Sequence, residues 1–274
     1  MGSFDQGYAG MTSLKAVNEW IGIINSNLGG SNRTAYKATK ISFGGGVVTI
    51  EKDPRPELNG IQIPDSTLNI NHTRTDFSQG TIVQDGELTH LAISGEGFFA
   101  VHDGTTTYYT RDGEFRWSVL NGQTILTTAA GLTVLGGSSP STTAYVGAGQ
   151  ALTYGVPILR YGTGSSFAVT LSSVTGASAN VAIYRFSNSQ ALKFSRFGST
   201  VFDASSAVGA NHIAGREQIL SGTVDVTQSA LEASNAALND TLPELSLAQK
   251  LFSAVSKIIN VNNSNLDTVV NLIR

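Results

Sequence analysis

The chain has 274 residues, of which 41% are hydrophobic and 14% charged, and its formal net charge is -3. This length accommodates one large or two modest domains with a packed core. A weakly acidic chain without a basic cluster has no surface that neutralises phosphates, which argues against nucleic acid as a partner. The absence of cysteine excludes disulfides and thiolate metal sites.

The N-terminal residues do not resemble a cleavable signal peptide. Residues 1–10 lack both a basic start and a long apolar stretch, and no run of about 18 apolar residues is present to span a membrane. We therefore expect no membrane insertion. If the protein leaves the cytoplasm, we expect a dedicated route that reads an uncleaved N-terminus.

The first predicted element is an amphipathic helix near the N-terminus. Its apolar residues recur every three or four positions and are Met11, Leu14, Val17, Ile21, Ile24 and Leu28. Gly29 and Gly30 then form a helix stop. Asn18 and Asn25 fall on the same stripe, where a polar side chain weakens packing but fixes the register between helices.

The middle of the chain predicts strands separated by glycine-containing turns, after a polar connector at 31–40. Strand candidates are residues 47–50, 61–63, 68–70, 91–101, 106–111, 114–119, 124–127, 132–135, 156–161, 166–172, 180–186 and 199–202. Their spacing of about 10 residues favours an antiparallel sandwich or barrel, because parallel strands need longer crossovers. Helical pattern is expected to return only near Val226.

The last predicted element is a second amphipathic helix. Its apolar stripe consists of Leu245, Ala248, Phe252, Val255, Ile259, Leu266, Val269 and Ile273, with Asn262 as the single break. Alternating steps of three and four residues predict a coiled-coil seam. Its expected start is at 241–244, where Thr241 caps the helix, Glu244 reciprocates and Pro243 lies in the first turn.

The two stripes suggest contacts with other subunits. Further apolar residues flank the C-terminal seam at Leu247, Leu251, Ile258 and Val270, so one partner helix does not cover the whole face. In the alternative interpretation, each helix packs on the β-domain as part of its core. The register asparagines and the broad apolar face favour the first interpretation.

These patterns predict an α+β fold, mainly β, with paired terminal helices that resemble a coiled coil and a central antiparallel β-rich domain. The expected domains are a helical terminal assembly domain at 1–45 and 228–274, an extended β connector at 46–80 and 205–227, and a β-rich outer domain at 81–204.

One glycine motif has the spacing of a dinucleotide-binding turn. Gly95 and Gly97 follow a strand and precede Ala100 as G-x-G-x-x-A. Pyrophosphate binding needs a helix to begin at this turn, whereas Phe98 and Phe99 continue as strand. We interpret the glycines as a tight turn or bulge, with both phenylalanines in the core.

The remaining polar residues predict no catalytic, cofactor or metal site. The histidines are isolated, with none at the spacing of a metal-ligand pair, and are His72, His90, His102 and His212. No G-x-S-x-G element is present. Asp112 and Glu114, beside a turn glycine, are interpreted as solvated turn residues. We therefore expect a protein that is not an enzyme.

Short motifs occur in several parts of the chain. They are NSNL at 25–28, TAYK at 34–37, SQG at 78–80, LAISGEGFFAV at 91–101, YTRDGEF at 109–115 and LEASN at 231–235. In this order they resemble motifs of the bacterial flagellar rod and hook protein family, and the length and layout are most like its distal and proximal rod proteins. Gly95, Gly97, Phe98, Phe99 and Gly113 carry the central part of this resemblance.

The resemblance implies a structural subunit of the rod or hook-basal body, in the periplasm or outside the cell. Such proteins are exported without signal cleavage and assemble helically into a tube, with paired terminal helices inside and a β-rich domain outside. The implied partners are identical subunits and neighbouring rod or hook proteins. Two alternatives are a rod-like homologue that forms a non-flagellar extracellular filament and a secreted carbohydrate-binding β-domain.

The chain departs from the family pattern at several positions. Ala35 stands where the family has a glycine before the aromatic residue, which is Tyr36 here. Pro243 replaces an ordinary helical residue, and residues 136–176 keep little of the pattern. The motifs on both sides of these positions remain in order.

Overall fold

The computed structural model describes residues 2–45, 49–50, 62–63, 67–120, 123–137, 158–160, 167–169, 179–181, 183–186, 188–204, 216–218 and 224–272. The chain divides into two compact units. Unit 1 contains residues 1–29, 39–76 and 236–274, and unit 2 contains residues 30–38 and 77–235. A helix near each end and strands between them agree with the predicted α+β class.

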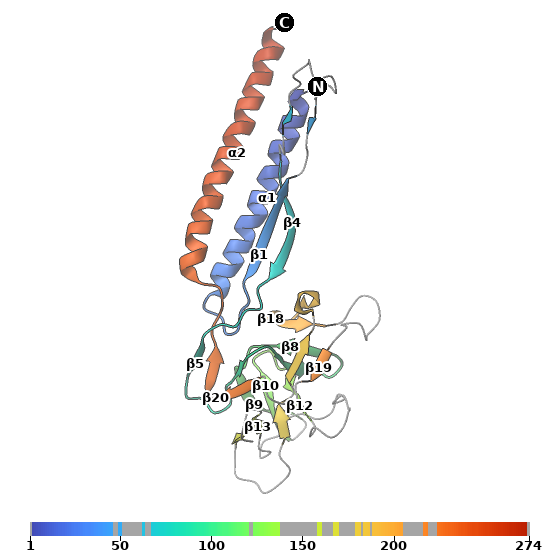
Figure 1. Ribbon diagram of the computed structural model, residues 1–274, viewed down its shortest axis with the longest axis vertical. Helices are drawn as coiled ribbons and strands as arrows, with labels where there is room; N and C mark the ends of the chain where they lie inside the picture. Colours follow the sequence, from blue (N-terminus) through green and yellow to red (C-terminus); the bar gives the residue numbers. More distant parts are fainter. Residues whose placement is uncertain are drawn as a thin grey trace. The chain divides into compact units, whose positions relative to one another are not determined.

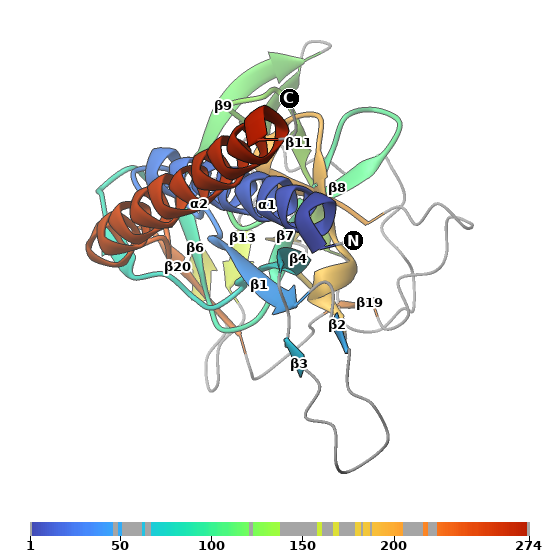
Figure 2. The same ribbon diagram turned by 90° about the horizontal axis from the view of Figure 1, so that it is seen from above.

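Unit 1 contains both helices, α1 (Gly2–Gly30) and α2 (Leu238–Leu272). They run alongside one another in opposite directions (Figures 1 and 2). Trp20 and Ile24 of α1 and Ala248 of α2 form the buried centre of this unit. The Trp20 ring meets the Phe43 ring edge to face, with 5.2 Å between their centroids.

Strands complete unit 1. Strand β1 (Thr39–Gly45) pairs antiparallel with β4 (Leu68–Thr75), and the register shifts between Ser42 and Phe43. Strands β2 (Thr49–Ile50) and β3 (Gln62–Ile63) form a short antiparallel pair. The sequence predicted parts of β2, β3 and β4 but missed β1, because its polar first residues resembled a connector.

The start of α2 differs from its prediction. The helix begins at Leu238, and Ala237 O already accepts the N–H groups of Asp240 and Thr241 at 3.2 Å. The Thr241 hydroxyl therefore does not cap the helix but donates to Leu238 O at 3.1 Å. Pro243 lies inside the helix, where its missing N–H removes one backbone hydrogen bond.

The prediction that helix returns near Val226 is also wrong. Val226 lies in β20 (Asp225–Gln228), which pairs with β6 (Leu91–Ser94), and the next residues form β21 (Ala230–Glu232), which pairs with β5 (Ile82–Gln84). Both pairs are antiparallel and join residues about 130 to 150 positions apart. Such long-range pairing decides between strand and helix for segments this short.

Unit 2 is built on a sheet that has nine strands among the described residues. Their sheet order is β17 (Lys193–Ser195), β18 (Gly198–Asp203), β8 (Thr107–Thr110), β7 (Phe98–His102), β11 (Thr133–Val134), β10 (Gln123–Thr128) and β9 (Phe115–Leu120), and β16 (Ile183–Phe186) pairs with both β7 and β19 (Arg216–Gln218). All these pairs are antiparallel. A one-turn 3-10 helix, η1 (Ser189–Ala191), precedes β17.

A smaller sheet also lies in unit 2. Its order is β12 (Gly136–Gly137), β15 (Ala179–Val181), β13 (Ile158–Arg160) and β14 (Phe167–Val169). Strands β13 and β15 are parallel, and the other two pairs are antiparallel. The parallel pair departs from the all-antiparallel prediction.

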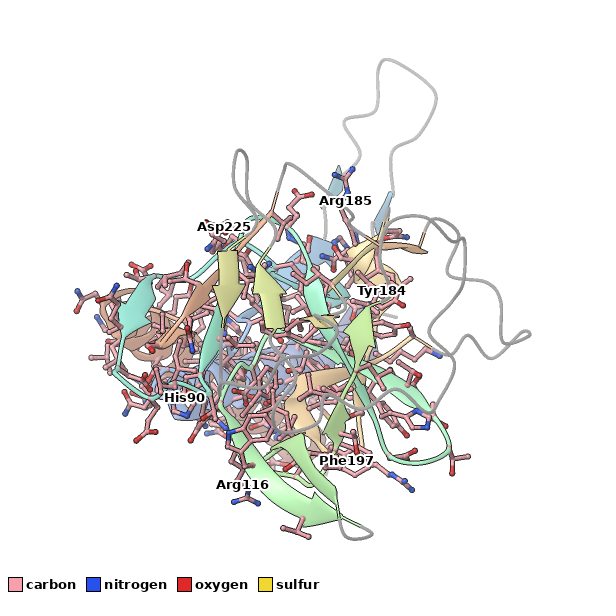
Figure 3. The ribbon with its side chains drawn as sticks, turned by 90° about the horizontal axis from the view of Figure 1, so that it is seen from below. His90, Arg116, Tyr184, Arg185, Phe197 and Asp225 are labelled. Atoms are coloured by element: carbon pink, nitrogen blue, oxygen red, sulfur yellow. The ribbon has the colours of Figure 1, made fainter. Side chains whose placement is uncertain are left out.

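The large sheet of unit 2 separates two apolar cores. Phe98 and Ala100 pack in one core, whereas the alternate residues Phe99 and Val101 pack in the other, because successive side chains of a strand point to opposite faces. The same alternation makes Arg116 of β9 exposed, and Figure 3 shows its guanidinium turned away from the packed side chains.

The strand predicted at 91–101 is divided into β6 and β7. Gly95 lies between them with φ of +108°, a backbone conformation that favours glycine. Strand β6 pairs with β20, whereas β7 pairs with β8, β11 and β16. The tight turn expected at these glycines therefore redirects the chain between two sheets.

The backbone approach at Gly113 predicts the effect of one substitution. A Cβ there would lie 1.6 Å from Leu91 O, so we expect Gly113→Ala to lower the free energy of unfolding by roughly 2–4 kcal/mol. Denaturant unfolding of the purified chain measures this change. In helix α1, an ideal Cβ on Gly22 would meet nothing within 4 Å beyond the adjacent backbone of its own helix, so Gly22→Ala should stabilise by about 0.5–1 kcal/mol. Equal stability of Gly113→Ala and wild type would contradict the packing described.

Candidate functional site

The buried face of α1 overlaps the stripe predicted from the sequence but is not identical to it. Val17 and Ile24 are buried, and Leu14, Ile21 and Leu28 are partly buried. Met11 is 59% exposed. From Ala9 onward, where burial is described, the buried residues of this helix are Ala9, Ser13, Ala16, Val17, Trp20, Ile24, Asn27 and Gly30. The buried face therefore centres on Trp20, which the prediction did not include.

The predicted register asparagines of α1 are exposed, and other polar residues bind the neighbouring strands. Asn18 and Asn25 lie outside the buried face. Asn27 Oδ1 accepts from Thr39 N at 2.9 Å, and its Nδ2 donates to Thr39 O at 2.8 Å. Ser13 Oγ accepts from Leu68 N at 2.9 Å and donates to Ala9 O. These side chains fix α1 to the starts of β1 and β4.

The predicted seam of α2 includes one of its two buried residues and most of its partly buried ones. Ala248 is fully buried, and four other positions of the seam are partly buried, namely Leu245, Val255, Ile259 and Asn262. Ile259 lies so close to α1 that a Cβ on Gly10 would be 2.8 Å from its Cγ1. The line from Leu245 to Asn262 therefore faces α1. Ile273 lies outside the described residues.

A broad apolar surface of α2 remains exposed in the single chain. Its members are 37% to 80% exposed and are Leu242, Leu247, Leu251, Phe252, Ile258, Val261, Leu266, Val269, Val270 and Leu272. A helix that is apolar on more than one side packs against more than one partner. Exposed apolar surface of this extent is typical of interaction sites. We name these ten residues the exposed face of α2.

In unit 2, three sequence motifs meet at the Gly95 turn. Gln79 Oε1 accepts from Gly95 N at 2.9 Å, and Gln79 Nε2 donates to Ile93 O at 3.1 Å. Arg111 Nη2 donates to Ile93 O and to Gly95 O at 3.1 and 2.8 Å. The motifs at 78–80, 91–101 and 109–115 therefore form one hydrogen-bonded structure. Gly97 is buried beside this turn.

Glu232 is the buried acceptor at the centre of a charge cluster. Lys37 Nζ and Gly80 N donate to its Oε1 at 2.6 and 2.7 Å, and Arg111 Nε donates to its Oε2 at 2.8 Å. The side chains of Lys37 and Glu232 are fully buried, and that of Arg111 is 3% exposed. Lys37 Nζ also donates to Ser78 O at 2.8 Å. One carboxylate therefore faces two cations, and backbone carbonyl oxygens accept the remaining hydrogen bonds of Lys37 and Arg111.

Sequence reasoning missed this charge cluster. Its three charged residues are separated by 74 and 121 positions, from Lys37 to Arg111 and from Arg111 to Glu232. No local spacing connects them, although each lies in or next to a motif of the family resemblance. The motifs therefore pointed to these residues, whereas only the folded structure shows that they form ion pairs.

Asp112 is more buried than the sequence analysis expected of a turn residue. Burial raises its pKa to about 6, although the hydrogen bond from Glu114 N to Asp112 Oδ1 opposes the rise. Glu114 is exposed, as expected. Asp112 is buried because the carbonyl of the adjacent Gly113 accepts from Leu91 N at 3.1 Å, which holds the turn against the core.

The described residues contain no group of three or more His, Asp or Glu side chains placed to hold a metal ion. Within the same ranges, neither helix has a stretch long and apolar enough to cross a membrane.

A hollow of about 430 Å³ in unit 2 is lined by residues that include Phe77, Phe98 and Phe186. The Arg111 guanidinium in this hollow already binds Glu232 and two carbonyl groups.

Known proteins resemble this chain along most of its length. Residues 92–164 match the family described as flagellar hook protein FlgE/F/G D1 domain. The chain is 26% identical to flagellar basal-body rod protein FlgG of Bacillus subtilis, over 97% of this chain and 98% of that protein. It is 28% identical to FlgG of Borreliella burgdorferi, over 92% of each chain.

The chain is thus similar to flagellar rod and hook proteins. It is also 30% identical to the flagellar hook protein FlgE of Helicobacter pylori, over 47% of this chain and 19% of that protein. The resemblance inferred from the motifs is therefore confirmed, and the chain is a structural flagellar rod or hook protein. The named relatives are structural proteins of the flagellum.

Ala35 shows how this flagellar protein accommodates its departure from the family motif. Its φ is +52°, in the left-handed region that glycine favours. Ala35 N donates to Glu232 O at 2.7 Å, and its side chain is buried. Ala35 therefore adopts a backbone conformation that favours glycine, at the position where the resemblance implies a glycine.

The charge cluster predicts a large loss of stability when its acceptor is neutralised. Glu232→Gln leaves the Lys37 and Arg111 cations buried without a carboxylate, so we expect the free energy of unfolding to fall by about 3–5 kcal/mol. Denaturant unfolding of the full chain measures the change. The matched control Glu114→Gln alters an exposed carboxylate and should change stability by less than about 0.5 kcal/mol. Similar values for both variants would contradict the role assigned to Glu232.

Asp112 predicts a pH dependence of stability. Because its folded pKa is about 6, above the ordinary 3.8, the folded state binds more protons between these values, and stability falls as pH rises through this window. Asp112→Asn should therefore stabilise by about 2–3 kcal/mol at pH 7.5 and give no gain below pH 4. Thermal unfolding at both pH values tests this. A gain that is equal at both would exclude titration of Asp112 as its source.

Proposed function

We propose that this protein is a subunit of the flagellar basal-body rod that assembles helically with its own copies into a tubular axial filament, without catalysis. The extent of similarity to known proteins supports a rod component. Alignment with the two rod proteins covers at least 92% of both partners, whereas alignment with the hook protein of Helicobacter pylori covers 19% of it. The region shared with the hook protein is therefore only a part of that longer chain.

The exposed face of α2 is the single observation that carries the assembly proposal. Ten large apolar side chains lie on it, and burying one such side chain contributes about 1.5–3 kcal/mol. We propose that helices of neighbouring subunits cover this face, and that α1 and α2 pair in the manner of a coiled coil along the line facing Trp20 and Ile24. The seam residues Phe252, Leu266 and Val269, with Met11 of α1, are then available to other copies.

A repeated contact between two different faces of the subunit produces a filament rather than a closed dimer. In this proposal identical subunits and neighbouring rod or hook proteins are the partners. The terminal assembly domain comprises 1–45 and 228–274, the connector 46–80 and 205–227, and the outer domain 81–204. We propose that the subunit is exported without cleavage of a signal peptide and functions in the basal body, in the periplasm or outside the cell.

One substitution on the exposed face tests the assembly proposal. Ile258 is 57% exposed, so Ile258→Lys should leave the folded monomer intact but place a charge in the subunit contact, which is costly without a partner. We expect negative-stain electron microscopy to show tubes for wild type and loss of tubes for this variant, with unchanged circular dichroism at low concentration.

The matched control is Asn260→Lys, on the same helix and also exposed. It adds the same charge two residues away at a polar position, so its tubes should persist. Normal tubes from Ile258→Lys would exclude this part of α2 as a contact, and a wild-type chain that never forms tubes would refute helical self-assembly.

A further inference from the structure

Four chain crossings connect the two units, and three of them are joined to one another inside unit 2. The chain passes between units at residues 29–30, 38–39, 76–77 and 235–236. Residues 35–38, 77–81 and 232–235 are the unit 2 segments next to three of these crossings. We name these segments together the crossing cluster.

Asn235 binds both of the other segments. Its Oδ1 accepts from Ala38 N at 2.7 Å, and its Nδ2 donates to Ser78 O and Ser78 Oγ at 3.0 and 3.2 Å. Its backbone N donates to Tyr36 O at 3.2 Å. One side chain, located at the last residue of unit 2, therefore connects the last residue of the first segment to the start of the second.

The Glu232 carboxylate reinforces the same three segments. It accepts from Lys37 of the first segment and from Gly80 N of the second. Ala233 N donates to Thr81 O at 2.8 Å, and a Cβ on Gly80 would lie 2.0 Å from Ala233 O. The segments are thus held at backbone contact, and Lys37 Nζ shares the acceptor Ser78 O with Asn235 Nδ2.

Covalent connectivity makes these contacts a path for mechanical load. Force carried along the peptide chain from unit 1 enters unit 2 at Gly30, Ala38, Phe77 or Asn235, because these residues are where the chain crosses. Hydrogen bonds that join two such residues share the force between segments. Without them, one segment could be drawn out of unit 2 while the others remained in place.

We propose that Asn235 is a load-bearing clamp that joins three of the four crossings, so that force carried along these three segments from unit 1 enters unit 2 at one place. The inference rests on the proposed function, in which subunits are joined through the terminal helices. Asn235 is a positioning residue in this role, supported by the Lys37–Glu232 ion pair. Other amide side chains of unit 2 make different contacts, because Gln79 binds Ile93 O and Gly95 N, and Asn188 accepts from Gln190 N.

Single-molecule pulling in two directions tests the clamp. The chain has no cysteine, so attachment points can be introduced as Lys40→Cys with Leu238→Cys, on both sides of the clamp, or as Val119→Cys with Lys193→Cys. The second pair lies on β9 and β17, at the two ends of the sheet order, so that force crosses the sheet. Each pair is made in the full-length monomer of wild type, Asn235→Ala and Asn188→Ala.

We expect Asn235→Ala to lose rupture force when pulled between residues 40 and 238 and to keep it when pulled across the sheet. Asn188→Ala is the matched control, because it removes an asparagine that binds only Gln190 N at 3.2 Å among the contacts described for its side chain. It should keep the rupture force between residues 40 and 238. Should Asn235→Ala not fold, Ser78→Ala removes one acceptor of the clamp and should give a smaller loss in the same direction only.

Equal loss in both directions would show that Asn235 serves general stability, and no loss in either would show that it carries no load. Each result overturns the clamp. The presence or absence of tubes in electron micrographs of the wild-type chain tests the proposed function separately. If Asn235→Ala loses rupture force in one direction only but wild type forms no tubes, the clamp stands and helical assembly is refuted. If wild type forms tubes but Asn235→Ala keeps its rupture force, assembly stands and the clamp is refuted.

Discussion

The structure of unit 2 depends on one buried carboxylate that two cations share. A buried ion pair contributes little net stability, because desolvation offsets much of the attraction, but an unpaired charge in the same place is costly. Only an arrangement that brings Lys37, Arg111 and Glu232 together satisfies all three. These residues come from the start, middle and end of the unit. The cluster therefore selects one arrangement of its long-range segments rather than simply adding to its stability.

Periodicity predicted those elements whose own side chains determine them. The apolar spacing of α1 and α2 and the alternation around Phe98, Tyr108 and Phe115 are visible within a few residues. By contrast, β5, β20 and β21 are short and β1 has polar first residues, and for all four a partner distant in sequence determines that they are strands. The start of α2 was missed for a related reason, because the Thr-x-Pro-Glu pattern resembles a cap although the helix already begins at Leu238.

The candidate interface was predictable as a stripe but not residue by residue. Trp20 was omitted because a large aromatic beside Glu19 and Ile21 fits more than one helical face, and the neighbouring Phe43 ring decides which face is covered. Ser13 and Asn27 are polar, so periodicity placed them outside, yet both bind strand backbone from within the buried face. The motifs located Glu232 and Arg111 without revealing that they form an ion pair. Periodicity thus identifies the buried face of a helix, whereas the polar contacts on that face can be identified only from the tertiary fold.

Alternate side chains of β7 enter two different cores, and this constrains where insertions and deletions can occur in the sequence during evolution. Inserting or deleting one residue within the strand would exchange the side chains that enter each core and place Phe98 where Phe99 fits. No single local adjustment restores both sets at once. Changes in length should therefore be accepted at hairpin ends and rejected between Gly97 and His102, so that related sequences align there without gaps even where individual residues differ.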